Sequence, residues 1–187
     1  MKLSRRFALS GLAVVAATPA VAKVSQIKDL QAAIDRAVEG EGVLVLAAGT
    51  YETPGVRIDK PIHIQGVPGL TKITCPAGGP IMVIEGAGDV TLSGLSFMGD
   101  RKPVSDDNHG AAMVMAGNTE HVTIADCRFQ QSSLIGLRLE GCGGRVSDCA
   151  FADIDASALF ALDSKGLEIS GNAVSRMGTN GIQVWTR

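Results

Sequence analysis

The stretch HVTIADCRFQQSSLIGLRLEGCGGRVSDCAFADIDASALFALDSKGLEISGNAVSRMGTNGIQVW, residues 121–185, contains nearly the same short pattern three times. Each copy has a β-branched run, then Asp-Cys-x-Phe or a variant, then small residues and a second apolar run. The first runs align at Ile124, Val146 and Ile169, which are 22 (146 − 124) and 23 (169 − 146) residues apart. An earlier copy, Leu92–Phe97, lies 32 residues (124 − 92) before the first, because residues 98–112 contain an inserted loop.

This period decides the fold class. A repeat of 20–50 residues is typical of stacked architectures, and about 22 residues hold three short strands with their turns. Such a unit is one coil of a parallel β-helix, in which inward positions form columns of like residues along the solenoid. The leucine-asparagine signature of leucine-rich repeats is absent. The copies predict three inward columns: Phe129, Phe151 and Val174; Leu137, Leu159 and Ile182; and Cys127, Cys149 and Asn172 at a turn.

The composition agrees with a single domain of this kind. The chain has 187 residues, which is a usual length for one domain, and its 45% apolar content is enough to bury a core. Its 23 glycines fit many short strands joined by tight turns. The net charge of −2 gives no indication of nucleic acid as a partner.

The N-terminus has the features of an export signal. A basic start with Arg5 and Arg6 precedes an apolar stretch, and Ala20-Val21-Ala22 matches the small-x-small cleavage pattern. The paired arginines indicate a twin-arginine signal, and an ordinary secretory signal is the alternative. We therefore expect residues 1–22 to be removed, residues 23–187 to form the β-helix, and the mature protein to be periplasmic or secreted without a stable membrane span.

An amphipathic helix precedes the strands. Apolar residues recur three and four apart from Ile27 to Ala37, with Ser25 as a possible N-cap and Gly40 as the end. The segment that follows, residues 42–66, is divided into short predicted strands by Gly and Pro.

This helix and the turn Gly49-Thr50-Tyr51 resemble the beginning of right-handed parallel β-helix proteins of the pectate-lyase-like superfamily. The resemblance covers about residues 25–187 and implies an all-β, right-handed solenoid with a short N-terminal capping helix. With the arginine pair, the chain also resembles twin-arginine-exported β-helix repeat proteins of unassigned function. It ends at GIQVWTR inside a predicted strand, so we expect it to be C-terminally incomplete or to self-associate at this open end.

The inserted loop provides the first candidate site. Asp106, Asp107 and His109 lie close together in it, and loops on a regular scaffold often carry function. Pectate lyases use aspartates to hold calcium, and related hydrolases use clustered aspartates as general acid and base. The resemblance thus implies a catalytic role, with calcium as a possible cofactor and no other expected. The alternative is a solvated polar loop.

The outer face of a repeated strand provides the second candidate. If Leu137 and Leu139 point inward, Arg138 and Glu140 point outward. The same register places Phe160 with Leu162, and Gln183 with Trp185, on that outer face. Aromatic side chains can stack on sugar rings while polar neighbours bind hydroxyls, so these residues are candidates for binding polysaccharide. The alternative is that further coils or a partner protein cover the patch.

The four cysteines, Cys75, Cys127, Cys142 and Cys149, leave two possibilities. Exported proteins form disulfides, and the pairs Cys127–Cys149 and Cys142–Cys149 are conceivable. Buried free thiols also pack well in repeated columns.

Two functions of different class follow. The first is an exported, non-catalytic solenoid that interacts with polysaccharide along its side. The alternative is a polysaccharide lyase or glycoside hydrolase that acts on acidic polysaccharide.

Overall fold

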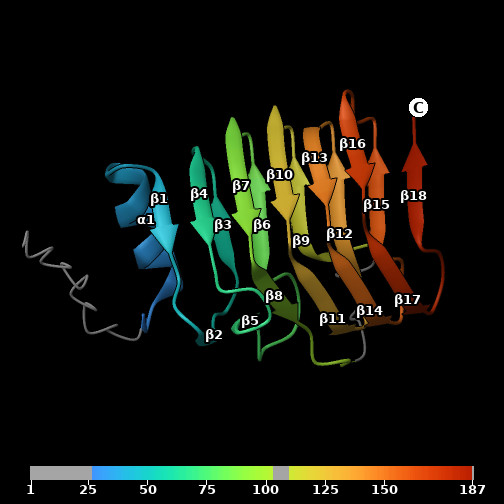
Figure 1. The fold of residues 1–187 in the computed structure, drawn as a ribbon, viewed down its shortest axis with the longest axis horizontal. Coiled ribbons are helices and arrows are strands. Elements are labelled where there is room, and N and C mark those ends of the chain that lie inside the picture. The colour runs from blue at the N-terminus through green and yellow to red at the C-terminus, as the bar shows by residue number, and fades with distance from the viewer. Residues whose placement is uncertain (1–26, 103–109, 187) are drawn as a thin grey trace, which may run out of the picture.

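The computed structural model describes residues 27–102 and 110–186, which form one α-helix and eighteen β-strands (Figure 1). The strands stack in three parallel sheets of six, and every third strand along the chain belongs to the same sheet. The chain therefore winds through six coils, and each coil gives one strand to each sheet. The sequence prediction of an all-β parallel solenoid is confirmed.

The first sheet contains β1 (Val43–Val45), β4 (Ile62–Gln65), β7 (Asp89–Ser93), β10 (His121–Ala125), β13 (Gly143–Ser147) and β16 (Leu167–Ser170). The second contains β2 (Gly49–Glu52), β5 (Thr71–Thr74), β8 (Leu95–Met98), β11 (Arg128–Ser132), β14 (Ala150–Ile154) and β17 (Ala173–Met177). The third contains β3 (Val56–Ile58), β6 (Met82–Glu85), β9 (Ala112–Gly117), β12 (Ile135–Glu140), β15 (Leu159–Leu162) and β18 (Ile182–Trp185).

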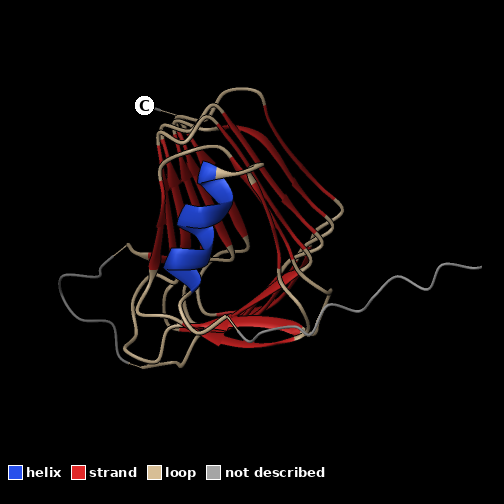
Figure 2. Cartoon of the chain, turned by 90° about the vertical axis from the view of Figure 1, so that its left-hand side faces the viewer, coloured by secondary structure: helices blue, strands red, loops and turns tan. Residues whose placement is uncertain are grey.

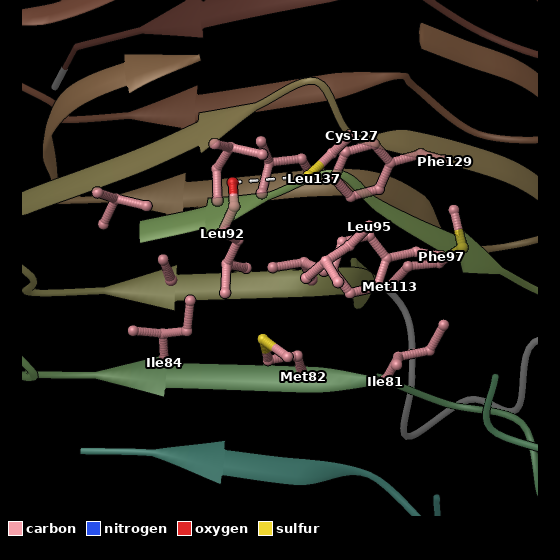
Figure 3. Packing of buried hydrophobic residues seen from close by; sticks show 14 of the residues in the cluster. Ile81, Met82, Ile84, Leu92, Leu95, Phe97, Met113, Cys127, Phe129 and Leu137 are labelled. Carbon is pink, nitrogen blue, oxygen red and sulfur yellow. Dashed lines mark hydrogen bonds between the residues drawn. The ribbon is translucent and has the colours of Figure 1, made fainter. Parts of the chain in front are cut away.

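The register between coils confirms the predicted columns. Phe129 pairs with Phe97 on one side and with Phe151 on the other, and Phe151 pairs with Val174. The three phenyl rings are stacked, with centroids 5.0 Å and 4.7 Å apart, and all are fully buried. Figure 3 shows two of them, Phe97 and Phe129, among other residues of the core. Offset stacking adds to the free energy gained by burying these large rings. Leu137, Leu159 and Ile182 form the equivalent column in the third sheet.

The backbone conformation explains why Asp recurs in the repeated Asp-Cys motif. Asp126 and Asp148 adopt φ values of 52° and 55°, and Gly94 and Gly171 occupy the same position in their coils with φ values of 64° and 67°. Asp and Gly tolerate this left-handed conformation better than most residues. One left-handed residue turns the chain from the first sheet to the second in each of these coils, and it leaves the next residue pointing inward.

The helix α1 (Leu30–Glu39) lies across the N-terminal end of the solenoid (Figure 2). It buries Leu30, Ala33 and Ile34 against the first coil. The predicted end at Gly40 is confirmed, but Ser25 is not the N-cap. Asp29 takes that role, since its backbone is extended and its carboxylate accepts a hydrogen bond of 3.0 Å from the amide of Ala32.

The cysteine column is part of the core. All four cysteines are buried free thiols, and Cys127 lies one coil from Cys149. Contact with the Cys149 thiol and burial raise the pKa of the Cys127 thiol well above its usual value. The next residue in the column, Asn172, accepts from the Cys149 amide and donates to the Val146 carbonyl, both at 2.9 Å. The predicted inward turn column is therefore confirmed.

The structure places the export-signal residues Arg5 and Arg6, and the rest of 1–26, outside the described residues. Among the described residues, the one helix has ten residues and is too short to cross a membrane.

Candidate functional site

The predicted outward strand face forms a groove on the third sheet. One outward column runs through Val83, Met115, Arg138, Phe160 and Gln183, and the next runs through Glu85, Gly117, Glu140, Leu162 and Trp185. A groove of about 550 Å³ lies over the later coils of this face. Its lining residues are Gly110, Ile135, Arg138, Phe160, Leu162, Gln183, Trp185 and Thr186.

Arg138 is held at the centre of this groove by three contacts. One guanidinium nitrogen donates to the Gly110 carbonyl at 2.8 Å, and another donates to the Glu140 carboxylate at 3.0 Å. The guanidinium carbon also lies 5.7 Å from the centre of the Phe160 ring. A cation over an aromatic face is attracted by the negative ring face. Arg138 is therefore fixed in place, with only 26% of its side chain exposed.

The aromatic side chains come from neighbouring coils. The ring centres of Phe160 and Trp185 are 6.1 Å apart, with the planes inclined by 50°. Trp185 is 58% exposed, so most of its ring is open to solvent. Gln183, which is paired with Phe160 and lies on the same strand as Trp185, accepts a hydrogen bond of 2.9 Å from the Ser157 hydroxyl, which orients the side-chain amide. The groove thus combines two aromatic rings with a fixed guanidinium and an oriented amide.

The structure brings together all five residues predicted for this face, with one refinement. Glu140 does not line the groove itself but holds Arg138, while the buried side chain of Leu162 forms part of the apolar wall. Leu162 occupies the outward register position that was predicted for it, and it is buried in the wall of the groove.

A second, smaller cleft lies where the inserted loop leaves the solenoid. It has a volume of about 170 Å³ and is lined by residues of the turn after β5, the segment after β8 and the turn after β11. Lys102 crosses this region, since its ammonium group pairs with Asp100 at 2.8 Å and contacts the Pro76 carbonyl. Burial alone would raise the pKa of the Asp100 carboxyl, but the hydrogen bonds and charge of Lys102 outweigh it and lower this pKa.

The predicted catalytic residues Asp106, Asp107 and His109 lie outside the described residues. Their catalytic role and the calcium site therefore stay predictions. Within residues 27–102 and 110–186, no group of three or more His, Cys, Asp or Glu side chains is placed to hold a metal ion.

Sequence reasoning missed a charged cluster beside this second cleft. Asp153 and Arg176 form a two-contact ion pair across coils, with nitrogen–oxygen distances of 2.7 Å and 2.8 Å. Arg101, at the start of the inserted segment, lies 3.9 Å from Asp153 and 3.8 Å from Asp155. The hydrogen bond from Arg176 lowers the pKa of the Asp153 carboxyl. The sequence signal that could have indicated this ion pair is the separation of 23 residues between Asp153 and Arg176, which is one repeat period.

Comparisons with known proteins agree with the geometry of the fold. The family model described as "Right handed beta helix region" matches residues 76–187, more than half of the chain. No protein with a curated description matches the chain.

Three solved structures resemble the chain, and the first of them has a TM-score above 0.5. A candidate glycosyl hydrolase from Parabacteroides merdae is 11% identical, with a TM-score of 0.55 over 77% of this chain and 86% of that chain. The catalytic domain of a GH87 α-1,3-glucanase with bound tetrasaccharides is 15% identical, with a TM-score of 0.46 over 86% of this chain and 38% of that chain. The A-module of the Azotobacter vinelandii mannuronan C-5 epimerase AlgE4 is 18% identical, with a TM-score of 0.34, and the coverage is 81% and 57%. From the matched repeats and the three parallel sheets, the chain belongs to the right-handed β-helix family.

Proposed function

We propose that this protein is exported and binds polysaccharide in the groove on the outer face of the third sheet. The observation that carries the proposal is the placement of Phe160 and Trp185 in one open groove with Arg138 and Gln183. Export rests on the arginine pair and apolar stretch at the N-terminus.

The chemistry of the groove suits a sugar chain. The apolar face of a sugar ring can stack on an exposed aromatic ring, and the Trp185 ring is largely exposed. Sugar hydroxyls can accept from the Gln183 amide and donate to carboxylate or carbonyl oxygens at the rim. Outward strand positions recur on successive coils, with strands about 4.8 Å apart. A chain lying along the solenoid axis would therefore meet one outward side chain of each column at every step, although these side chains differ from coil to coil.

The fold adds indirect support. The structure from Parabacteroides merdae with which this chain shares its fold is described as a candidate glycosyl hydrolase. Carbohydrates are thus the first class of ligand to test.

The test is a measurement of polysaccharide binding with matched variants. Soluble polysaccharides, both neutral and acidic, are included in native gels, and the retardation of the protein gives the dissociation constant. We expect saturable retardation by at least one polysaccharide. The double variant Phe160→Ala/Trp185→Ala should bind it at least about tenfold more weakly, which corresponds to about 1.4 kcal/mol.

The control is Val45→Ala, which removes an exposed apolar side chain from β1, on another sheet and in the first coil. This variant should bind as the wild type does. Equal binding by the double variant and the wild type would contradict the assignment to the groove. Release of unsaturated uronates in the same samples, dependent on added calcium, would instead favour the lyase.

A further inference from the structure

We infer that the groove selects neutral polysaccharide over acidic polysaccharide. This inference rests on the proposed function, and it assigns the class of ligand from the charges around the groove. Arg138 is the one charged side chain among the described residues that line the groove. The other lining residues contribute aromatic, aliphatic, amide, hydroxyl and backbone groups.

The charge of Arg138 is already compensated within the protein. Its guanidinium pairs with the Glu140 carboxylate at 3.0 Å, and a second nitrogen donates to the Gly110 carbonyl at 2.8 Å. The face of the group lies against the Phe160 ring. A uronate carboxylate that approached the guanidinium would lie close to the Glu140 carboxylate already paired there. Repulsion from Glu140 would offset the attraction of Arg138, so binding of a uronate at this point would bring little net gain.

The neighbouring outward column adds negative charge along the same face. Glu85, Gly117 and Glu140 occupy successive rungs of this column. The Glu85 carboxylate extends over Gly117, onto the space that a side chain there would fill, and accepts a hydrogen bond of 2.9 Å from the Asn118 amide. The two glutamates are two rungs apart, and the Glu85 carboxylate lies over the rung between them. Glu140 is paired with Arg138, so Glu85 leaves one net negative charge on this part of the face. A polyuronate along the solenoid axis carries one negative charge per sugar and would be repelled by it.

A neutral chain avoids this repulsion and keeps the favourable contacts. Ring stacking on Trp185 and Phe160 needs no ligand charge, and the Gln183 amide, oriented by Ser157, can bond to hydroxyls. Every favourable contact that the groove can make with an acidic ligand is therefore also open to a neutral ligand.

The experiment compares two sets of oligosaccharides on the full chain by isothermal titration calorimetry. One set contains linear neutral hexasaccharides of glucose and of mannose in several linkages. The other set contains hexamers of galacturonate and of mannuronate. At 50 mM NaCl we expect the best neutral hexasaccharide to bind at least tenfold more tightly than either uronate. Its dissociation constant should change less than twofold at 500 mM NaCl, because Coulomb contributions are screened at high salt.

A charge variant sharpens the test without touching the lining of the groove. Glu85→Gln keeps an oxygen for the Asn118 amide but removes one negative charge from the edge. It should strengthen uronate binding about threefold at 50 mM NaCl, because one exposed pair of charges changes a binding free energy by less than about 1 kcal/mol. Neutral binding should stay within twofold of the wild type.

The outcomes separate this inference from the proposed function. Tighter, salt-sensitive binding of a uronate, weakened by Phe160→Ala/Trp185→Ala, would overturn the selectivity and leave the groove as the polysaccharide site. Uronate binding that does not respond to Glu85→Gln would likewise count against the role of the acidic column. Absence of binding by both sets would overturn the proposed function, and the inference with it.

Discussion

The inward and outward columns of the third sheet belong to the same strands and differ by a single residue in register. Inward, Leu137, Leu159 and Ile182 are alike from coil to coil. Outward, the adjacent positions hold Arg138, Phe160 and Gln183, which share no chemistry. Repetition inside is required because each coil packs on the next with closely similar geometry. Outside, each position faces solvent, so the solenoid tolerates a different side chain on every rung, and the candidate site is built from those differences.

The largest expected effect tests the inward side of this comparison. Phe129→Ala removes the central ring of the stack between Phe97 and Phe151 and leaves a cavity in the core. We expect it to lower the free energy of unfolding by about 3–5 kcal/mol. Phe160→Ala, the matched outward variant, should lower it by about 1 kcal/mol, since its ring is only half buried. Urea unfolding followed by circular dichroism measures both, and equal losses would remove the distinction between the two faces.

A smaller effect concerns a polar side chain in an inward column. Asn172→Ala leaves the Cys149 amide and the Val146 carbonyl without their partner, and the expected loss of unfolding free energy is about 1–3 kcal/mol. Asn172→Asp keeps the acceptor for Cys149 but loses the donor to Val146, so its loss should be intermediate. The same denaturation measurement applies. If Asn172→Ala were as stable as the wild type, the hydrogen bonds of this side chain would contribute nothing to the free energy of unfolding.

The smallest effect is expected for the outward ion pair. The hydrogen bond from Arg176 and the charges of Arg176 and Arg101 lower the folded-state pKa of Asp153. A lowered pKa stabilises the fold above the unfolded value of about 3.9, and this stabilisation is lost as the pH falls through the folded-state pKa. The difference in stability between wild type and Asp153→Asn should therefore be small at pH 7 and should disappear once the pH falls below the folded-state pKa of Asp153.

Because the pair lies at the surface, with the Arg176 side chain 65% and the Asp153 side chain 34% exposed, added salt should also reduce that difference at pH 7. Thermal unfolding at several pH values and salt concentrations provides the measurement. A difference that grows toward acidic pH would show that the ion pair is not its source.

The fold could be predicted from the sequence because similar apolar residues recur at the inward positions once per coil. Ile124, Val146 and Ile169 align by eye, and the structure pairs them in that register. The three columns, the outward direction of Arg138 and Phe160, and the position of the inserted segment followed from the same period. Strict alternation of side chains along a strand fixes the outer face once the inner face is known.

The rest could not be predicted, for reasons that differ from residue to residue. The helix begins after Asp29 because its carboxylate reaches the amide of Ala32, and sequence alone did not favour Asp29 over Ser25. Asp153 and Arg176, which form an ion pair, both have a left-handed backbone, with φ values of 57° and 58° inside β14 and β17, and the repeat pattern gave no sign of this. The supporting role of Glu140 depends on the conformations of two long side chains, which a repeat pattern does not specify.

The register of the last three coils has an evolutionary consequence. Because these coils are offset by 22 or 23 residues and pair in parallel in all three sheets, duplicating one such unit would add a rung to every sheet at once. The duplicated coil would pack against inward side chains like its own on both sides, so its core residues would fit those of its neighbours. Its outer residues would be free to diverge, and the binding groove would lengthen by one step of about 4.8 Å. Ligand length in such proteins can thus change through duplications that leave the existing rungs untouched.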